Sequence, residues 1–336
     1  MKYCDKLIFD PRYEGCLGAE EEYWTINPEG TRFKIIAPKL FLGKVPVICD
    51  EREIKPELPA QQIEGVTGIC SSLTEIEHDL ERVRRRLHKL GAVHRFAIDT
   101  YPVPRFSFKT RVYPKERYLR VTKGMPREIL RGGWITGLHG HYGCRSLEQA
   151  IRILNGLRAL IPMFVSLSAR SSHYQGNTRG YASERIMQYL TIQPRLMSPH
   201  IEGPQHLEEL AHDGGFSDDA GRCWWAVRIN SKGTVEVRIM DMQGSSRHAA
   251  ELLAVLSTVC HQIRHGARSV NTHATAASIE CSIFDAATQP GLRSSYMHEI
   301  QGLIDYAHEN FLMCERMYLE SLFKRLYPFF VKEGCE

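Results

Sequence analysis

Hydrophobic and polar residues alternate in several short segments of this chain, with the period of two that is typical of β-strands. The clearest case is "TVEVRIMD", residues 234–241, in which β-branched residues alternate with Glu236 and Arg238. The turn sequence "INSKGT" overlaps its start and predicts a hairpin. Strands are therefore expected at residues 18–26, 58–67, 93–98, 137–144 and 224–241, the last containing this hairpin.

Apolar residues recur three or four positions apart in other segments, which predicts amphipathic helices. One helix should begin at Ser72, where Glu75 completes a capping box, and should end at Gly91. Further helices are expected from Ser146, over residues 247–265, and twice within residues 292–331.

Strands and helices follow one another in mixed order, without an internal repeat or a low-complexity linker. We therefore expect a single domain, residues 1–336, of the α+β class, with an antiparallel sheet covered on one face by helices. The other face is then free for chemistry. Residues 99–128 are rich in Pro, Arg and Tyr and are expected to form a long irregular excursion.

Composition and charge narrow the class of protein. The net charge is only +4 over 336 residues, and the basic run "RVRRRLHK", residues 82–89, falls on the outer face of the first predicted helix. We interpret that run as a solvated helix face and expect no nucleic-acid partner. The ten cysteines include no C-x-x-C pair, the N-terminus is polar, and no apolar stretch reaches the roughly 20 residues that span a bilayer. These features predict a cytoplasmic protein without a membrane partner.

Three adjacent acids, residues 20–22 in "GAEEEYW", are the first candidate functional residues in the chain. On a strand, Glu20 and Glu22 share one face, whereas Glu21 points the other way and is expected to be structural or solvent-exposed. Glu57 and Glu64 are seven residues apart, an interval that would place them on opposite faces of an unbroken strand. Pro59 makes an unbroken strand unfavourable, so both acids could reach one site.

Two histidines in "GLHGHYG", His139 and His141, also share a strand face, as do Glu236 and Arg238. Each motif alone fits a bland role, such as an exposed edge pair, a packed histidine or a cross-strand ion pair. Together, several carboxylates with an imidazole favour Mg²⁺ or Mn²⁺ over zinc, and an arginine beside such ions suits phosphate.

The motifs, taken in chain order, resemble the second type of glutamate-cysteine ligase and its relatives, which are ATP-dependent carboxylate-amine ligases distantly related to glutamine synthetase. The matching segments cover roughly residues 14–245 and are "GAEEEYWTINPEG", "ELPAQQIEGVTGIC", "GLHGHYGC", "LIPMFVSLSARSSHYQGNTRGYASER" and "WWAVRINSKGTVEVRIMDMQ". The region beyond about residue 247 matches poorly and is expected to be a divergent helical part.

This resemblance implies a curved antiparallel sheet that binds ATP and Mg²⁺ and forms an amide through an acyl phosphate. The metal ligands that it implies are Glu20, Glu22, Glu57, Glu64, His139 and Glu236. It also assigns Arg238 to the transferring phosphoryl group, makes Glu57 the second candidate catalytic residue, and places His139 with Arg238 at the nucleotide.

Substrate contacts follow from the same resemblance. Arg185 matches the arginine that closes the family's substrate loop, Tyr181 its aromatic residue, and Arg117 an arginine on the long excursion. The family loop usually reads "GxDTGY", whereas this chain has "GNTRGY", with Arg179 as a new cation. We interpret this change as favouring a more anionic substrate. Trp224 is expected to pack beneath the sheet.

The expected substrates are therefore a small-molecule carboxylate and an amine, with a homo-oligomer left open. Two alternatives remain at this point. The same superfamily resemblance extends to guanidino phosphotransferases, which yield a stable phosphorylated product. A homologue that binds nucleotide without catalysis is the other.

Overall fold

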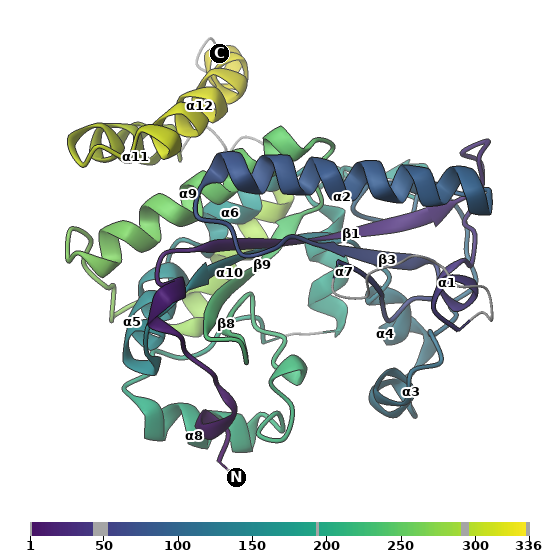
Figure 1. Ribbon diagram of the computed structural model, residues 1–336, viewed down its shortest axis with the longest axis horizontal. Coiled ribbons are helices and arrows are strands. Elements are labelled where there is room, and N and C mark those ends of the chain that lie inside the picture. Colours follow the sequence, from purple (N-terminus) through teal and green to yellow (C-terminus); the bar gives the residue numbers. More distant parts are fainter. Residues whose placement is uncertain (1, 43–52, 193–194, 290–295, 334–336) are drawn as a thin grey trace.

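The computed structural model describes residues 2–42, 53–192, 195–289 and 296–333. Its centre is an antiparallel sheet in the order β2-β3-β1-β5-β9-β8, with β4 paired to the far end of β1 (Figure 1). The strands are β1 (Leu17–Ile26), β2 (Ile54–Pro56), β3 (Gln62–Val66), β4 (Ala97–Asp99), β5 (Gly137–Gly143), β8 (Val227–Ile229) and β9 (Thr234–Asp241). A separate small hairpin is formed by β6 (His173–Tyr174) and β7 (Asn177–Thr178).

Two long helices, α2 (Leu73–His94) and α9 (Ser246–Arg264), lie against one face of the sheet, while α3 and α4 lie on the other side (Figure 1). The remaining helices are α1 (Ala37–Leu42), α3 (Glu116–Thr122), α4 (Arg127–Gly132), α5 (Leu147–Arg158), α6 (Ile161–Ser168), α7 (Glu184–Ile192), α8 (Pro204–Asp213), α10 (Ala276–Thr288), α11 (Met297–Glu309) and α12 (Met313–Glu333). The predicted α+β class with an antiparallel sheet is confirmed.

The predicted helix starts are confirmed, but one predicted end is wrong. The Ser72 hydroxyl accepts a hydrogen bond from the Glu75 amide at 3.2 Å. Helix α2 continues past Gly91 to His94 and ends at Arg95, whose φ is 55°. Gly91 is needed for close packing, because a Cβ there would lie 2.3 Å from the Phe96 carbonyl oxygen. The strand expected at residues 93–98 is therefore reduced to β4.

The long excursion is more ordered than its composition predicts. Residues 99–128 contain α3 and lead into α4, so the expectation of an irregular segment is wrong for its second half. The strand expected at residues 58–67 is likewise shorter, because it is limited to β3. Helix α10 was not expected at all, although the helices expected near residues 247–265 and within 292–331 are present as α9, α11 and α12.

The helix-covered face of the sheet contains a buried ion pair. Glu21 is fully buried, so the expectation that it is structural holds and the alternative of solvent exposure is wrong. Its carboxylate accepts hydrogen bonds from the Arg84 guanidinium, one at 2.8 Å, and from the Tyr23 hydroxyl. Arg84 also donates to the Gln243 carbonyl oxygen at 3.0 Å. The basic run on α2 is thus only partly solvated, because Arg84 joins the helix to the sheet.

Among the described residues, no single helix is long and apolar enough to cross a membrane. Helices α5 and α6, which are bent by 62° relative to each other, reach the length and apolar content of a membrane span only when they are taken together.

We expect Arg84→Ala to lower the free energy of unfolding by about 3 to 5 kcal/mol, because it leaves the Glu21 carboxylate buried without its cation. Arg85, which is exposed on the same helix, is the matched control, and Arg85→Ala should change stability by no more than about 0.5 kcal/mol. Urea unfolding of the two variants measures both values. Equal losses would show that the Glu21–Arg84 pair is not a stability determinant.

Candidate active site

The strand register brings the predicted acidic and histidine residues together on the open face of the sheet. On β1, Glu22 lies opposite Glu64 of β3, and Glu20 lies opposite His139 of β5. Directly opposed residues of antiparallel strands project from the same face. His141 of β5 lies opposite Glu236 of β9 in the same way, which extends the row to the fourth strand.

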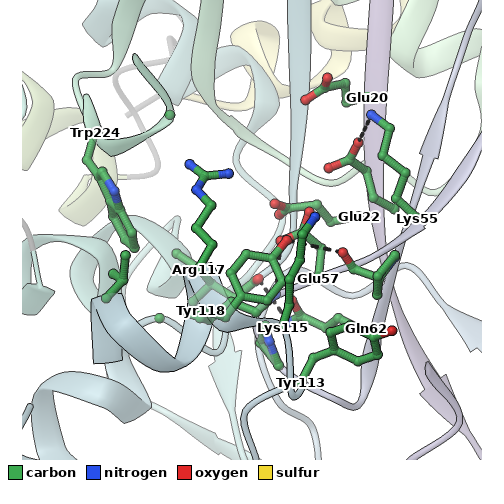
Figure 2. Close-up of a pocket in the computed structure, with 18 of the residues that line it drawn as sticks. Glu20, Glu22, Lys55, Glu57, Gln62, Tyr113, Lys115, Arg117, Tyr118 and Trp224 are labelled. Atoms are coloured by element: carbon green, nitrogen blue, oxygen red, sulfur yellow. Dashed lines mark hydrogen bonds and ion pairs between the residues drawn. The ribbon is translucent and has the colours of Figure 1, made fainter. Parts of the chain in front are cut away.

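A cavity of about 710 Å³ lies over this face (Figure 2). Its lining includes these predicted site residues: Glu20, Glu22, Glu57, Glu64, His139, Arg117, Arg185 and Arg238. Glu236 is fully buried behind this lining. Residues that are up to about 220 positions apart in the chain are thus gathered at one site.

At one end of the row, a carboxylate oxygen from each of Glu20 and Glu236 and a ring nitrogen of His141 lie within 4.8 Å of one another. His139 Nδ1 lies 3.4 Å from Glu20 Oε2, and its Nε2 lies 3.8 Å from Glu22 Oε1. His141 Nε2 is buried and has no hydrogen-bond partner among the described residues, although Glu20 Oε1 is 3.6 Å away. Carboxylate oxygens together with imidazole nitrogens form a donor set that can hold a divalent cation.

Two arginines neutralise Glu236. Its carboxylate accepts hydrogen bonds from Arg228 at 2.9 and 3.1 Å, from Arg238, and from the Asn230 amide at 2.7 Å. Although burial alone would raise the pKa of Glu236, the two arginines hold it well below its usual value. The imidazoles of His139 and His141 lower the pKa of Glu20 against burial in the same way. This end of the site therefore holds charged carboxylates.

The carboxylates at the opposite end of the row have fewer positive charges beside them. Burial raises the pKa of Glu22 to about 7. Burial and repulsion from Glu20 and Glu57 raise the pKa of Glu64 well above its usual value. Burial also raises the pKa of Glu57. Carboxylates in this arrangement repel one another unless a cation lies between them.

A β-bulge shapes the centre of the site. The pairing of β5 with β9 shifts register between Leu138 and Gly140, so that two β9 residues face His139. The Arg185 guanidinium donates to the carbonyl oxygens of both bulged residues, Ile239 at 2.9 Å and Arg238 at 3.0 Å. Gly137 leaves room for it, because a Cβ there would lie 2.2 Å from Arg185 Nη2. Arg185 thus fixes the backbone that carries Arg238.

Asp241, which the sequence motifs did not single out, holds to β9 both ends of the loop that is predicted to contact substrate, residues 171–183. Its buried carboxylate accepts hydrogen bonds from the Ser171 hydroxyl at 2.7 Å and the Ser183 hydroxyl at 2.8 Å. Ser171 in turn accepts a hydrogen bond from the Arg185 amide at 3.1 Å. Asp241 and the two serines therefore position Arg185. Arg228, the partner of Glu236, was missed as well, because its role depends on the strand register.

The wall opposite the sheet comes from α3 and the segment before β8. Figure 2 shows Arg117 and Trp224 across the cavity from Glu20 and Glu22. Arg117 Nε donates to Asp219 at 2.8 Å. Trp224 packs against the main hydrophobic core, in line with the expected packing role, and its half-buried ring also lines the cavity, which was not expected.

Two predicted substrate residues lie elsewhere in the described structure. Tyr181 and Arg179 are not among the residues that line the cavity. The Arg179 guanidinium donates to Glu184 at 3.0 Å and lies 5.5 Å from the Tyr181 ring centre and 5.8 Å from that of Tyr174. The geometry therefore gives Arg179 a role within the loop, and its contact with substrate stays a prediction.

A second cavity of about 430 Å³ adjoins the first along the sheet. The two share lining residues Glu20, Lys55, Arg117, Gly221 and Arg228. The second cavity also has an apolar wall with Val66 and Ile69, and it includes His141 and Lys232. The shared residues thus form a junction between the two cavities beside the Glu20 carboxylate.

The fold is an antiparallel sheet whose open face carries acidic and histidine residues over a cavity, and solved structures share it. The glutamate–cysteine ligase from Francisella tularensis, solved in complex with AMP, has a similar fold, with a TM-score of 0.64 and 12% identity over 94% of this chain and 83% of that one. At this identity the likeness shows the fold alone.

The chain belongs to the Glutamate-cysteine ligase family 2 (GCS2), whose model matches residues 16–314. It is 29% identical over 236 residues to a relative from Solibacter usitatus that carries the name glutamate–cysteine ligase 2, covering 67% of this chain and 60% of that protein. A relative of the same name from Salmonella dublin is 26% identical over 260 residues, covering 73% of this chain and 67% of that protein. The chain thus spans about 60 to 67% of the length of these two relatives.

The raised pKa of Glu22 predicts a pH dependence of stability in the metal-free protein. The folded state holds this proton up to about pH 7, whereas the unfolded chain releases it near 4.5. The contribution of Glu22 to stability should therefore fall as pH rises through that range, by about 2 to 3 kcal/mol between pH 5 and pH 8.

Burial lowers the pKa of His139 to about 4, which has the opposite effect on the pH dependence of stability. Because that histidine is present in both proteins, urea unfolding in EDTA at the two pH values, for wild type and Glu22→Gln, measures the contribution of Glu22. The exposed Glu81→Gln is the control. A wild type and a Glu22→Gln variant that lose stability in parallel would contradict the assignment.

Proposed function

We propose that this chain is an ATP-dependent carboxylate-amine ligase that forms an amide through an acyl phosphate, in the manner of a γ-glutamyl transfer to an amine. The observation that carries this proposal is the arrangement of Arg238. Its guanidinium is paired with the buried Glu236 and lines the same cavity as Glu20, Glu22 and His139. An arginine held beside clustered oxygen ligands suits a phosphoryl group that accumulates negative charge during transfer.

The two adjoining cavities divide the substrates. We assign the nucleotide to the smaller cavity, because Val66 and Ile69 offer an apolar wall for a base and Lys232 adds a cation. A triphosphate that starts there would reach the junction at Glu20 and point toward Arg238. The larger cavity then takes the carboxylate and the amine.

The predicted set of six metal ligands would hold Mg²⁺ or Mn²⁺ at this junction. These residues are Glu20, Glu22, Glu57, Glu64, His139 and Glu236. When bound, such ions neutralise the phosphate oxygens and lower the electrostatic barrier to transfer.

The proposed reaction has two steps, phosphoryl transfer and amide formation. A carboxylate oxygen of the first substrate attacks the γ-phosphorus of ATP, the bond to the β-phosphate breaks, and ADP leaves. The amine nitrogen then attacks the acyl carbon, the bond to phosphate breaks, and an amide and inorganic phosphate remain. Arg238 stabilises the transferring group, and the departing phosphate accepts the proton that the amine loses.

The outer wall of the larger cavity favours an anionic substrate. It presents Lys115, Arg117 and Arg222 together with the aromatic rings of Tyr118 and Trp224. The cations of this wall suit a carboxylate beyond the one that is activated. We therefore propose that this wall, rather than Arg179, favours an anionic substrate.

Turnover tests the proposal directly. ADP and phosphate release with Mg²⁺ should be detected for at least one pair in a panel of amino acids, small acids and amines, with an amide as product. Arg238→Gln should lower kcat about 100- to 1,000-fold, because it removes a charge aimed at the transferring group. Arg222→Gln, on the same cavity wall and paired with Asp218, should change kcat less than about tenfold.

Other outcomes would favour the alternatives. A stable phosphorylated product would favour a guanidino phosphotransferase. Nucleotide binding without turnover for any pair would favour a non-catalytic homologue.

Arg117 and Arg179 separate two explanations of substrate charge. Arg117→Ala should raise the KM of the acid substrate about 10- to 100-fold, because a hydrogen bond to a charged group is lost. Arg179→Ala should change this KM less than about threefold, since its guanidinium is bound to Glu184 outside the cavity. Steady-state kinetics with one active pair measure both, and a larger effect at Arg179 would restore its predicted role in substrate binding.

A further inference from the structure

Lys55 brings a positive charge into the acidic row. It lies on the short strand β2, directly opposite Glu64 in the register of β2 with β3. Its Nζ lies 3.0 Å from Glu64 Oε1 (Figure 2). The Lys55 side chain is 34% exposed and that of Glu64 only 10%. The ammonium group therefore reaches from the rim of the site toward a carboxylate that lies deeper.

The cations at the two ends of the row differ in kind. Glu236 is neutralised by Arg228 and Arg238, whose planar guanidinium groups form several fixed hydrogen bonds. Glu64 is neutralised by a single ammonium on a flexible four-carbon chain. Such a group makes one directed contact and moves without distorting the backbone. Glu236 is thus held by several hydrogen bonds, whereas Glu64 has one ammonium contact, which is more easily replaced.

Glu64 lies among other acids. It is directly opposite Glu22 on β1, and Glu20 and Glu57 line the same cavity. The position between Glu64 and its acidic neighbours is also where the predicted ligand set would hold a divalent ion. A divalent ion bound to the same carboxylate would repel this ammonium, so binding of one cation disfavours binding of the other.

We propose that Lys55 is an exchangeable counter-cation, which holds Glu64 while no divalent ion is bound there and yields that carboxylate when one binds. This inference rests on the proposed function, since it takes Glu64 as a metal ligand. After displacement, the ammonium stays at the junction, because Lys55 lines both cavities. There it lies on the path that we assign to the triphosphate.

Manganese binding without nucleotide tests the exchange. Titrations of the full chain followed by electron paramagnetic resonance would compare wild type with Lys55→Met, Lys55→Arg and Lys115→Met. Lys115 lines the same cavity and lies against the Tyr118 ring, which makes it a matched control. Lys55→Met should bind Mn²⁺ about tenfold more tightly, because the competing charge is gone. Lys55→Arg and Lys115→Met should stay within about threefold of wild type.

Thermal unfolding gives a second readout. In EDTA, Lys55→Met should melt below wild type, because Glu64 loses its counter-cation. Saturating Mg²⁺ should remove that deficit, since the ion takes the place of the ammonium. A folded Lys55→Met that binds Mn²⁺ no more tightly than wild type overturns the proposal. A variant that stays unfolded even in millimolar Mn²⁺ also overturns it, because the ion then does not replace the ammonium.

These outcomes are independent of turnover. Tighter Mn²⁺ binding by Lys55→Met in a protein without ligase activity would support the exchange and refute the proposed function. Ligase activity together with unchanged Mn²⁺ binding in Lys55→Met would support the proposed function and refute the exchange.

Discussion

Neutralising a row of carboxylates on one sheet face is the constraint on which the rest of this structure depends. Antiparallel pairing places Glu20, Glu22 and Glu64 side by side, and their mutual repulsion would oppose folding without cations. The chain supplies these cations from different elements. Arg228 and Arg238 come from the β8–β9 hairpin, and Lys55 comes from an edge strand. The hairpin and the edge strand are therefore as necessary to the site as the acids themselves.

Glutamate side chains on the two faces of β1 lie in different environments. On the helix-covered face, Glu21 is sealed by Arg84 and Tyr23 and has no route to the cavity. On the open face, Glu20 and Glu22 are held by histidines and backbone amides that leave carboxylate oxygens toward the cavity. Alternation along a single strand thus separates an acid that stabilises the fold from acids that are available to ligands. A one-residue slip in register would exchange these roles.

Much of this arrangement could be predicted from the sequence, because strand periodicity fixes which side chains share a face. The pairs on each strand, such as Glu20 with Glu22, were found in that way. The partners across strands were not, because register depends on tertiary packing. Arg228 opposite Glu236 is an example. Trp224 was predicted only in part, because an aromatic residue beside a strand suits both core packing and a cavity wall, and its ring contributes to both. The end of α2 was misplaced because Gly91 serves close packing with the chain at Phe96 rather than helix termination.

The position of Arg185 shows why the site cannot be separated from its loop. Its guanidinium is bound to the two carbonyl groups that the β9 bulge frees, and its amide is bound to Ser171, which Asp241 also holds. A change at Asp241 would therefore reach Arg238 through the backbone of the bulge without touching any substrate. Because Arg179 lies within the same loop but outside the cavity, the departure of this loop from the family pattern affects the support of the site first. The cavity wall formed by α3 and Trp224 is built from a different part of the chain and does not depend on this loop sequence, so the proposed selection of the substrate is separate from the support of the site.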